Sequence, residues 1–183
     1  RLLSLQVAKE QRRIAREAKA AKARRLRFKE GKGEVDVPEM ADGHYHTFLS
    51  HVWGTGQDQM RIVKTRLLEM LPDIEVFLDV DNLGGGKDHP HIDVSNTVLC
   101  FCTRRWFTNK PCVREILRAV LRKKLCIAVL ESDPSDQGGG HTEAEARDIL
   151  LSEVYAQRLQ NQMADQLADW RVEWGMPELE MPT

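Results

Sequence analysis

Residues 95–131, "SNTVLCFCTRRWFTNKPCVREILRAVLRKKLCIAVLE", contain the pattern that decides the fold. Two short segments, 95–103 and 124–131, are rich in Val, Leu, Ile and Cys and predict buried strands. Between them, from residue 110 onward, apolar side chains recur at helical spacing after Pro111, which suits the first turn of a helix. A strand, a helix and a second strand in this order predict a parallel sheet covered by helices.

The same alternation extends toward the N-terminus. Strands are predicted at 44–52 and 74–80, with a helix inside 54–72 between them and a loop at 81–91. Residues 141–174 are expected to be mainly helical. This alternation predicts an α/β domain whose parallel sheet has helices on both faces, joined by right-handed crossovers.

A basic N-terminal segment precedes this acidic domain. The first 32 residues carry 12 Lys or Arg and three Glu, a net charge of +9, whereas the remainder has a net charge of -10. Residues 1–30 lack Gly and Pro and predict one long basic helix, followed by a linker at 31–43 and the domain at 44–183. Apolar side chains recur there every seven residues, at Val7, Ile14, Ala21 and Phe28. This helix is expected to support a weak coiled coil or to dock on the domain, and its charge also suits a nucleic-acid or membrane-surface arm. The near absence of aromatic side chains makes nucleic acid the less favoured partner.

The composition, 42% hydrophobic and 30% charged, is typical of a soluble globular protein, and no apolar run has the roughly 18 residues of a membrane span. The chain begins at Arg1, so we expect a fragment of a longer protein. Four Cys without a paired framework predict reduced thiols and a cytoplasmic setting. Cys100 and Cys102 alternate in one predicted strand and are expected to be a buried pair of small side chains. Surface imidazoles are favoured over zinc for the two His-x-His pairs, His44/His46 and His89/His91.

Ligands of parallel sheets bind beyond the carboxyl ends of the strands, so the segments after each predicted strand are candidates. Glu115 lies near this edge. Its position opposite the apolar stripe of the helix favours a solvated Glu bonded to Arg118, but a carboxylate lining a crevice is the alternative. The stretch "GTGQDQ" at 54–59 lacks the third Gly of a dinucleotide fingerprint, and Asp79 and Asp81 are only near the expected acidic position. A Rossmann oxidoreductase is therefore disfavoured.

Three segments together resemble a TIR (Toll/interleukin-1 receptor) domain. "YHTFLSHVWG" (45–54) resembles the first box of that family, and "VFLDVDNLGGG" (76–86) resembles its second strand and BB loop. "CVREIL" (112–117) resembles the Cys-x-x-Glu-Leu sequence that opens the third helix of enzymatic members. The resemblance covers residues 44–131 and implies an α/β fold with a flavodoxin-like parallel sheet and helices on both faces. A TIR domain has a fifth strand, and none is evident after Leu130, so we expect the chain to end before the fold closes.

The resemblance implies that Glu115 is the catalytic residue of an NAD+ nucleosidase, which splits NAD+ into nicotinamide and ADP-ribose products. NAD+ would be the substrate, with no further cofactor and no metal. Activity would require self-association with other TIR domains in intracellular signalling. The residues expected to contact the substrate are Ser50, His51, Trp53, Gly54, Asp81, Asn82, Leu83, Gly84, Trp106 and Cys112.

One carboxylate is enough for this chemistry. The nicotinamide ring is cationic in NAD+ and departs as a neutral molecule, so no acid has to protonate it. A single Glu can then stabilise the oxocarbenium ion at the ribose. Trp53 or Trp106 would stack on a flat ring, with packing as the alternative for each. Because Glu115 is expected opposite the apolar stripe, its removal should cost the fold about 0.5 kcal/mol at most. The alternative function is a non-catalytic TIR scaffold that binds other TIR domains.

Overall fold

The computed structural model describes residues 11, 14, 26–31, 33–79, 89–135 and 139–180. Its strands alternate with helices along the chain, as the sequence predicts. The elements in order are β1 (Tyr45–Ser50), α2 (Gln57–Met70), β2 (Val76–Phe77), α3 (His89–Asp93), β3 (Ser95–Cys102), the short 3₁₀ helix η2 (Trp106–Thr108), α4 (Lys110–Leu121), β4 (Leu125–Leu130), α5 (Glu143–Leu151) and α6 (Glu153–Trp174).

The four strands form one parallel sheet in the order β2-β1-β3-β4. The predicted flavodoxin-like α/β class is therefore confirmed. The chain leaves β1 toward β2 on one side and returns to β3 on the other, so the strand order reverses between β1 and β3. In sheets of this kind that reversal opens a crevice at the carboxyl ends of the strands. Ser50, the last residue of β1, lies at this point opposite Cys100 of β3.

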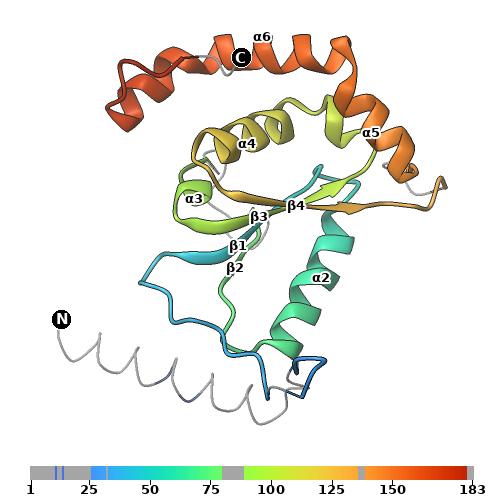
Figure 1. The fold of residues 1–183 in the computed structure, drawn as a ribbon, viewed down its shortest axis with the longest axis vertical. Helices are drawn as coiled ribbons and strands as arrows, with labels where there is room; N and C mark the ends of the chain where they lie inside the picture. The colour runs from blue at the N-terminus through green and yellow to red at the C-terminus, as the bar shows by residue number, and fades with distance from the viewer. Residues whose placement is uncertain are drawn as a thin grey trace.

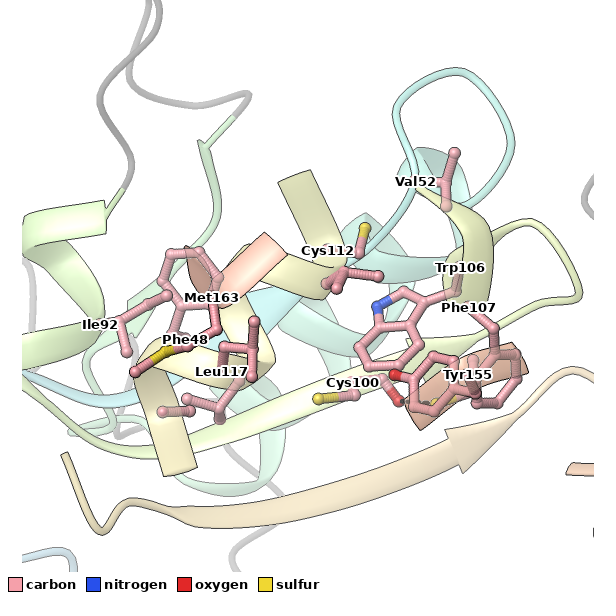
Figure 2. Packing of buried hydrophobic residues seen from close by; sticks show 14 of the residues in the cluster. Phe48, Val52, Ile92, Cys100, Trp106, Phe107, Cys112, Leu117, Tyr155 and Met163 are labelled. Carbon is pink, nitrogen blue, oxygen red and sulfur yellow. Dashed lines mark hydrogen bonds between the residues drawn. The ribbon is translucent and has the colours of Figure 1, made fainter. Parts of the chain in front are cut away.

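Helices cover both faces of the sheet (Figure 1). On one face α3, α4, α5 and α6 enclose the larger core, where Phe48 and Trp106 pack with Leu117 of α4 and Met163 of α6 (Figure 2). On the other face α2 covers a smaller core around Leu49 and Met60. The consequence for α4 is that it lies between the sheet and α6, with neighbours on two sides.

Strand positions agree with the sequence pattern except at the edge of the sheet. β3 and β4 match the predicted segments within one residue at each end, and Cys100 and Cys102 are a buried pair, as expected. β2 is much shorter than the predicted 74–80. It pairs with β1 on one side only, and the carbonyl of Glu75 accepts from both the His46 and Thr47 amides, at 2.8 and 3.4 Å, which ends the regular ladder.

The predicted N-terminal helix is wrong at its C-terminal end. Instead of a helix, a bridge pairs Arg27 with Glu34, and Gly31 and Gly33 have φ +69° and +92°. Of residues 1–25 the structure describes Gln11 and Ile14, which are helical, and the rest of the predicted helix lies outside the described residues.

Two further boundaries differ from the expectations. The predicted loop at 81–91 ends earlier, because His89–Asp93 form α3, and residues 81–88 lie outside the described part of the chain. The helical region after 141 is two helices, since the Ser152 side chain accepts from the Tyr155 amide and begins α6.

A buried Arg ties α6 to the sheet layer. Arg118 of α4 is 1% exposed and donates to both oxygens of Asp93, at 2.9 and 2.7 Å, and to both oxygens of Glu173, at 2.9 and 2.7 Å. Its guanidinium lies 5.0 Å from the ring centre of Trp174, whose indole N–H donates to Asp93. Burial alone would lower the pKa of Arg118, but these carboxylates outweigh it and raise the pKa. We call Arg118, Asp93, Glu173 and Trp174 the clamp.

Candidate active site

Three side chains from three different elements meet where the strand order reverses. The hydroxyl of Ser50, at the end of β1, donates to Oε2 of Glu115 in α4 at 2.6 Å. The same Ser50 oxygen accepts from the indole N–H of Trp106 in η2 at 3.0 Å. The hydroxyl hydrogen is thus directed to the carboxylate while its oxygen is held by the indole. This chain of two hydrogen bonds fixes where the Glu115 carboxylate lies.

The local sequence places α4 at this edge. The Asn109 side chain accepts from the Cys112 amide at 3.2 Å and caps the helix, and Pro111 occupies the first turn, where a missing N–H is tolerated. Trp106–Thr108 form the short 3₁₀ turn that leads from β3 to this cap. Glu115 therefore lies within the second turn of α4, close to the carboxyl end of the sheet.

The expectation of a solvated Glu115 is wrong. Glu115 is 6% exposed, and the Arg118 guanidinium pairs with Asp93 and Glu173 in the clamp. Val120 is one of the apolar side chains that recur at helical spacing after Pro111, and it is expected to be buried, but it is 54% exposed. The physical reason is that α4 contacts both the sheet and α6, so positions that a single-sided helix would expose to water are covered.

Cys112 is fully buried beside the carboxylate. Its thiol donates to the carbonyl oxygen of His51 at 3.3 Å. Burial raises the pKa of Cys112 well above its usual range, and the negative charge of Glu115 raises it further. Burial also raises the pKa of Cys102 to about 12. Both thiols therefore stay protonated at neutral pH, and neither is a thiolate nucleophile.

A second group of side chains lies after β1 and β2. Trp53 is 62% exposed, and its indole N–H donates to Oδ2 of Asp79. The other oxygen of Asp79 lies 3.7 Å from Nε2 of His51, a buried imidazole. Asp79 is not among the site residues predicted from the sequence. The available signal was an acidic side chain near the carboxyl end of the predicted strand 74–80, and because β2 ends at Phe77, Asp79 lies beyond it at the ligand-binding edge.

Glycines shape the turn between β1 and α2. Gly54 has φ +79°, a left-handed conformation that side chains disfavour. A Cβ on Gly56 would lie 2.9 Å from the ring of Phe101, closer than real Cβ atoms pack, and 3.3 Å from Cβ of His51, a tight contact. This turn therefore sits tightly against β3 and follows Trp53 directly.

The predicted site residues divide into three groups. Ser50, Trp106, Cys112 and Glu115 come together, although Trp106 is 2% exposed and its ring is covered by the core, so it offers no face for stacking. His51, Trp53 and Gly54 lie on the segment that follows Ser50. The residues of the expected BB loop lie outside the described residues: Asp81, Asn82, Leu83 and Gly84.

The predicted His pairs make structural contacts where their side chains are described. His46 contacts the Pro38 carbonyl oxygen at 2.8 Å and accepts from the Glu75 amide at 2.9 Å, and His91 stacks on Phe77 at 4.1 Å. Within the described ranges no group of three or more His, Cys, Asp or Glu side chains could hold a metal ion. No helix in that part of the chain is both long and apolar enough to cross a membrane.

Comparison of the chain with protein-family models, with curated proteins and with solved structures found no match.

Proposed function

We propose that the protein is a TIR-type NAD+ nucleosidase that cleaves NAD+ to nicotinamide and ADP-ribose products when copies self-associate in intracellular signalling. The observation that carries the proposal is the Glu115 carboxylate held by Ser50 at the strand-order reversal between β1 and β3. Ligands of doubly wound sheets bind at this place. In the resemblance to enzymatic TIR domains, the glutamate of the Cys-x-x-Glu-Leu motif corresponds to Glu115.

In the proposed reaction the bond between ribose C1′ and the nicotinamide nitrogen breaks, and its electron pair stays on nicotinamide. The ring loses its positive charge, and an oxocarbenium ion develops at the ribose. The Glu115 carboxylate stabilises this cation, and an orienting hydroxyl from Ser50 keeps it in position without neutralising it. Water then adds to C1′ and releases a proton, giving ADP-ribose.

Burial strengthens this electrostatic effect. Glu115 is largely shielded from water, and its charge is felt by the thiols of Cys100 and Cys112, whose pKa values burial has already raised. Charges interact more strongly in such surroundings than in water. The same buried thiols remain neutral and so do not compete with water at C1′.

The second candidate function is a TIR scaffold that binds other TIR domains and catalyses nothing. One observation favours it: at 6% exposure, Glu115 is covered as thoroughly as a structural carboxylate. A residue whose only task is to bond Ser50 and stiffen the β1–α4 contact would look the same. The two candidates differ in what loss of the charge does to nicotinamide release.

The test incubates the full chain with NAD+ over a range of protein concentrations and measures free nicotinamide by chromatography. We expect release that increases more than linearly with protein concentration, and a fall of about a hundred- to thousandfold in Glu115→Gln, since one electrostatic stabiliser supplies about 3–4 kcal/mol. Glu143→Gln is the matched control, because Glu143 is an exposed first-turn carboxylate of α5, and it should behave as wild type.

Circular dichroism and thermal unfolding establish that each variant is folded. Equal rates for the wild type and Glu115→Gln would reject the catalytic role of Glu115. A wild type that releases no nicotinamide at any concentration would favour the scaffold.

A further inference from the structure

Trp53 is a large exposed aromatic side chain that is nevertheless held in place. It is 62% exposed, yet its indole N–H donates to Asp79, two residues after β2. Its backbone is bounded by His51, whose carbonyl accepts from the Cys112 thiol, and by the left-handed Gly54. The Trp53 ring thus faces solvent while its N–H is held by Asp79, and we call this ring the plate.

Asp79 connects this plate to the interior. The Asp79 side chain is 9% exposed, so its carboxylate lies mostly below the surface while its partner Trp53 lies above it. Its Oδ1 faces the buried Nε2 of His51 at 3.7 Å, a nitrogen that makes no hydrogen bond within the described residues. The carboxylate thus lies between an exposed indole and a buried imidazole.

The plate and the Glu115 site share a neighbour. Cys112 lies in the field of both Glu115 and Asp79, each of which raises its pKa beyond the effect of burial. Trp53 follows Ser50 by three residues, and Ser50 bonds Glu115 directly. The plate therefore borders the edge of the sheet at which the Glu115 carboxylate is held.

We propose that Asp79 is a positioning residue that holds the Trp53 indole as a stacking plate for the cationic nicotinamide ring of NAD+. This inference rests on the proposed NAD+ cleavage. A Trp face attracts a cation through its negative quadrupole, more strongly than Tyr or Phe. Fixing the indole before binding avoids the entropy cost of ordering it with the ligand.

The inference has a kinetic signature. The nicotinamide ring is cationic in bound NAD+ and becomes neutral as the bond breaks, so the plate favours the ground state at least as much as the transition state. Losing it should raise KM without lowering kcat, the opposite of losing Glu115. A residue that merely supports the fold would lower the active fraction and therefore the apparent kcat.

The first measurement needs no activity. The indole N–H resonance of Trp53 is identified by its loss in Trp53→Phe and followed in the Glu115→Gln protein, which retains bound NAD+. We expect Asp79→Leu to shift this resonance, because the acceptor is gone, and Asp79→Asn to preserve it largely, because an amide oxygen still accepts. Asp73→Leu, an exposed position in the turn before β2, is the matched control and should leave it unchanged.

The second measurement uses ligands. NAD+ should perturb the Trp53 resonance, and NADH, whose reduced nicotinamide ring is neutral, should bind about tenfold more weakly, the size of a partly desolvated cation–π interaction. In the active protein, Asp79→Leu should raise KM for NAD+ about tenfold with kcat undiminished. The same substitution should have no further effect in a Trp53→Leu background, because its partner is already absent.

Three results would overturn the inference: an unshifted Trp53 resonance in Asp79→Leu, equal binding of NAD+ and NADH, or a rise in KM that persists in the Trp53→Leu background. These outcomes are separable from failure of the proposed function. Nicotinamide release that survives in wild type while Asp79→Leu changes neither KM nor the resonance rejects only the role of Asp79. A wild type that releases no nicotinamide rejects cleavage. The NAD+ and NADH titrations then decide whether Trp53 binds the nicotinamide ring.

Discussion

Two charged side chains of α4 are buried in different ways. Arg118, 1% exposed, is bonded through its guanidinium to two carboxylates and lies against Trp174. Glu115, 6% exposed, accepts a hydrogen bond from the hydroxyl of Ser50. The two positions are three residues apart on one helix, yet one faces the α3–β3 junction and α6, and the other faces the carboxyl edge of the sheet.

The difference separates a structural charge from a candidate functional one. The clamp matches the charge of Arg118 with opposite charges in forked geometry, which holds α6 against the rest of the domain. Ser50 orients the Glu115 carboxylate with a neutral donor at the edge of the sheet where ligands of such folds bind. Replacing Arg118 should therefore act mainly on stability, whereas replacing Glu115 should act mainly on the proposed reaction.

The largest effect on stability is expected for Arg118→Met. Removing one partner of a buried charge pair typically costs about 3–5 kcal/mol, and the partial exposure of Glu173 favours the lower end. Urea unfolding measures the cost. Arg122→Met is the control on the same helix, because Arg122 is more exposed and lies 3.6 Å from Asp93, so it should lose about 1 kcal/mol or less. Equal losses of unfolding free energy in the two variants would contradict the stabilising role of the clamp.

An intermediate effect is expected for Glu115→Ala. The substitution leaves the buried Ser50 hydroxyl without its acceptor and should cost about 1–3 kcal/mol of the free energy of unfolding, not the 0.5 kcal/mol that the helical pattern predicts. Thermal unfolding of Glu115→Ala, Ser50→Ala and the double variant measures the coupling between the two side chains. Additive losses would mean that the hydrogen bond is not formed in solution.

The smallest effect is expected for Arg66→Gln. Arg66 and Glu69 of α2 form an exposed pair at 2.7 Å, as short as the clamp contacts. In water such a pair is worth about 0.5 kcal/mol or less. The change should scarcely move the urea midpoint, and a loss approaching that of Arg118→Met would show that distance, not burial, sets the energy of these pairs.

The sequence by itself determined the layers of the fold. Strands β1, β3 and β4, helix α4 and the buried Cys100–Cys102 pair follow from local patterns of apolar side chains, and the structure confirms them. Burying an apolar side chain is favourable whichever partner covers it, so these patterns can be interpreted without knowing the neighbours. The resemblance that singled out Glu115 likewise depended on short local motifs.

Only the tertiary structure decided which polar side chains are buried and with whom. Ser50 and Glu115 are 65 residues apart, Arg118 and Glu173 are 55 apart, and Trp53 and Asp79 are 26 apart. A helical pattern identifies the side of α4 that meets the sheet, but not the further side that meets α6. Because burying a charge is favourable only when specific partners arrive from distant parts of the chain, its burial cannot be deduced from the helix that carries it.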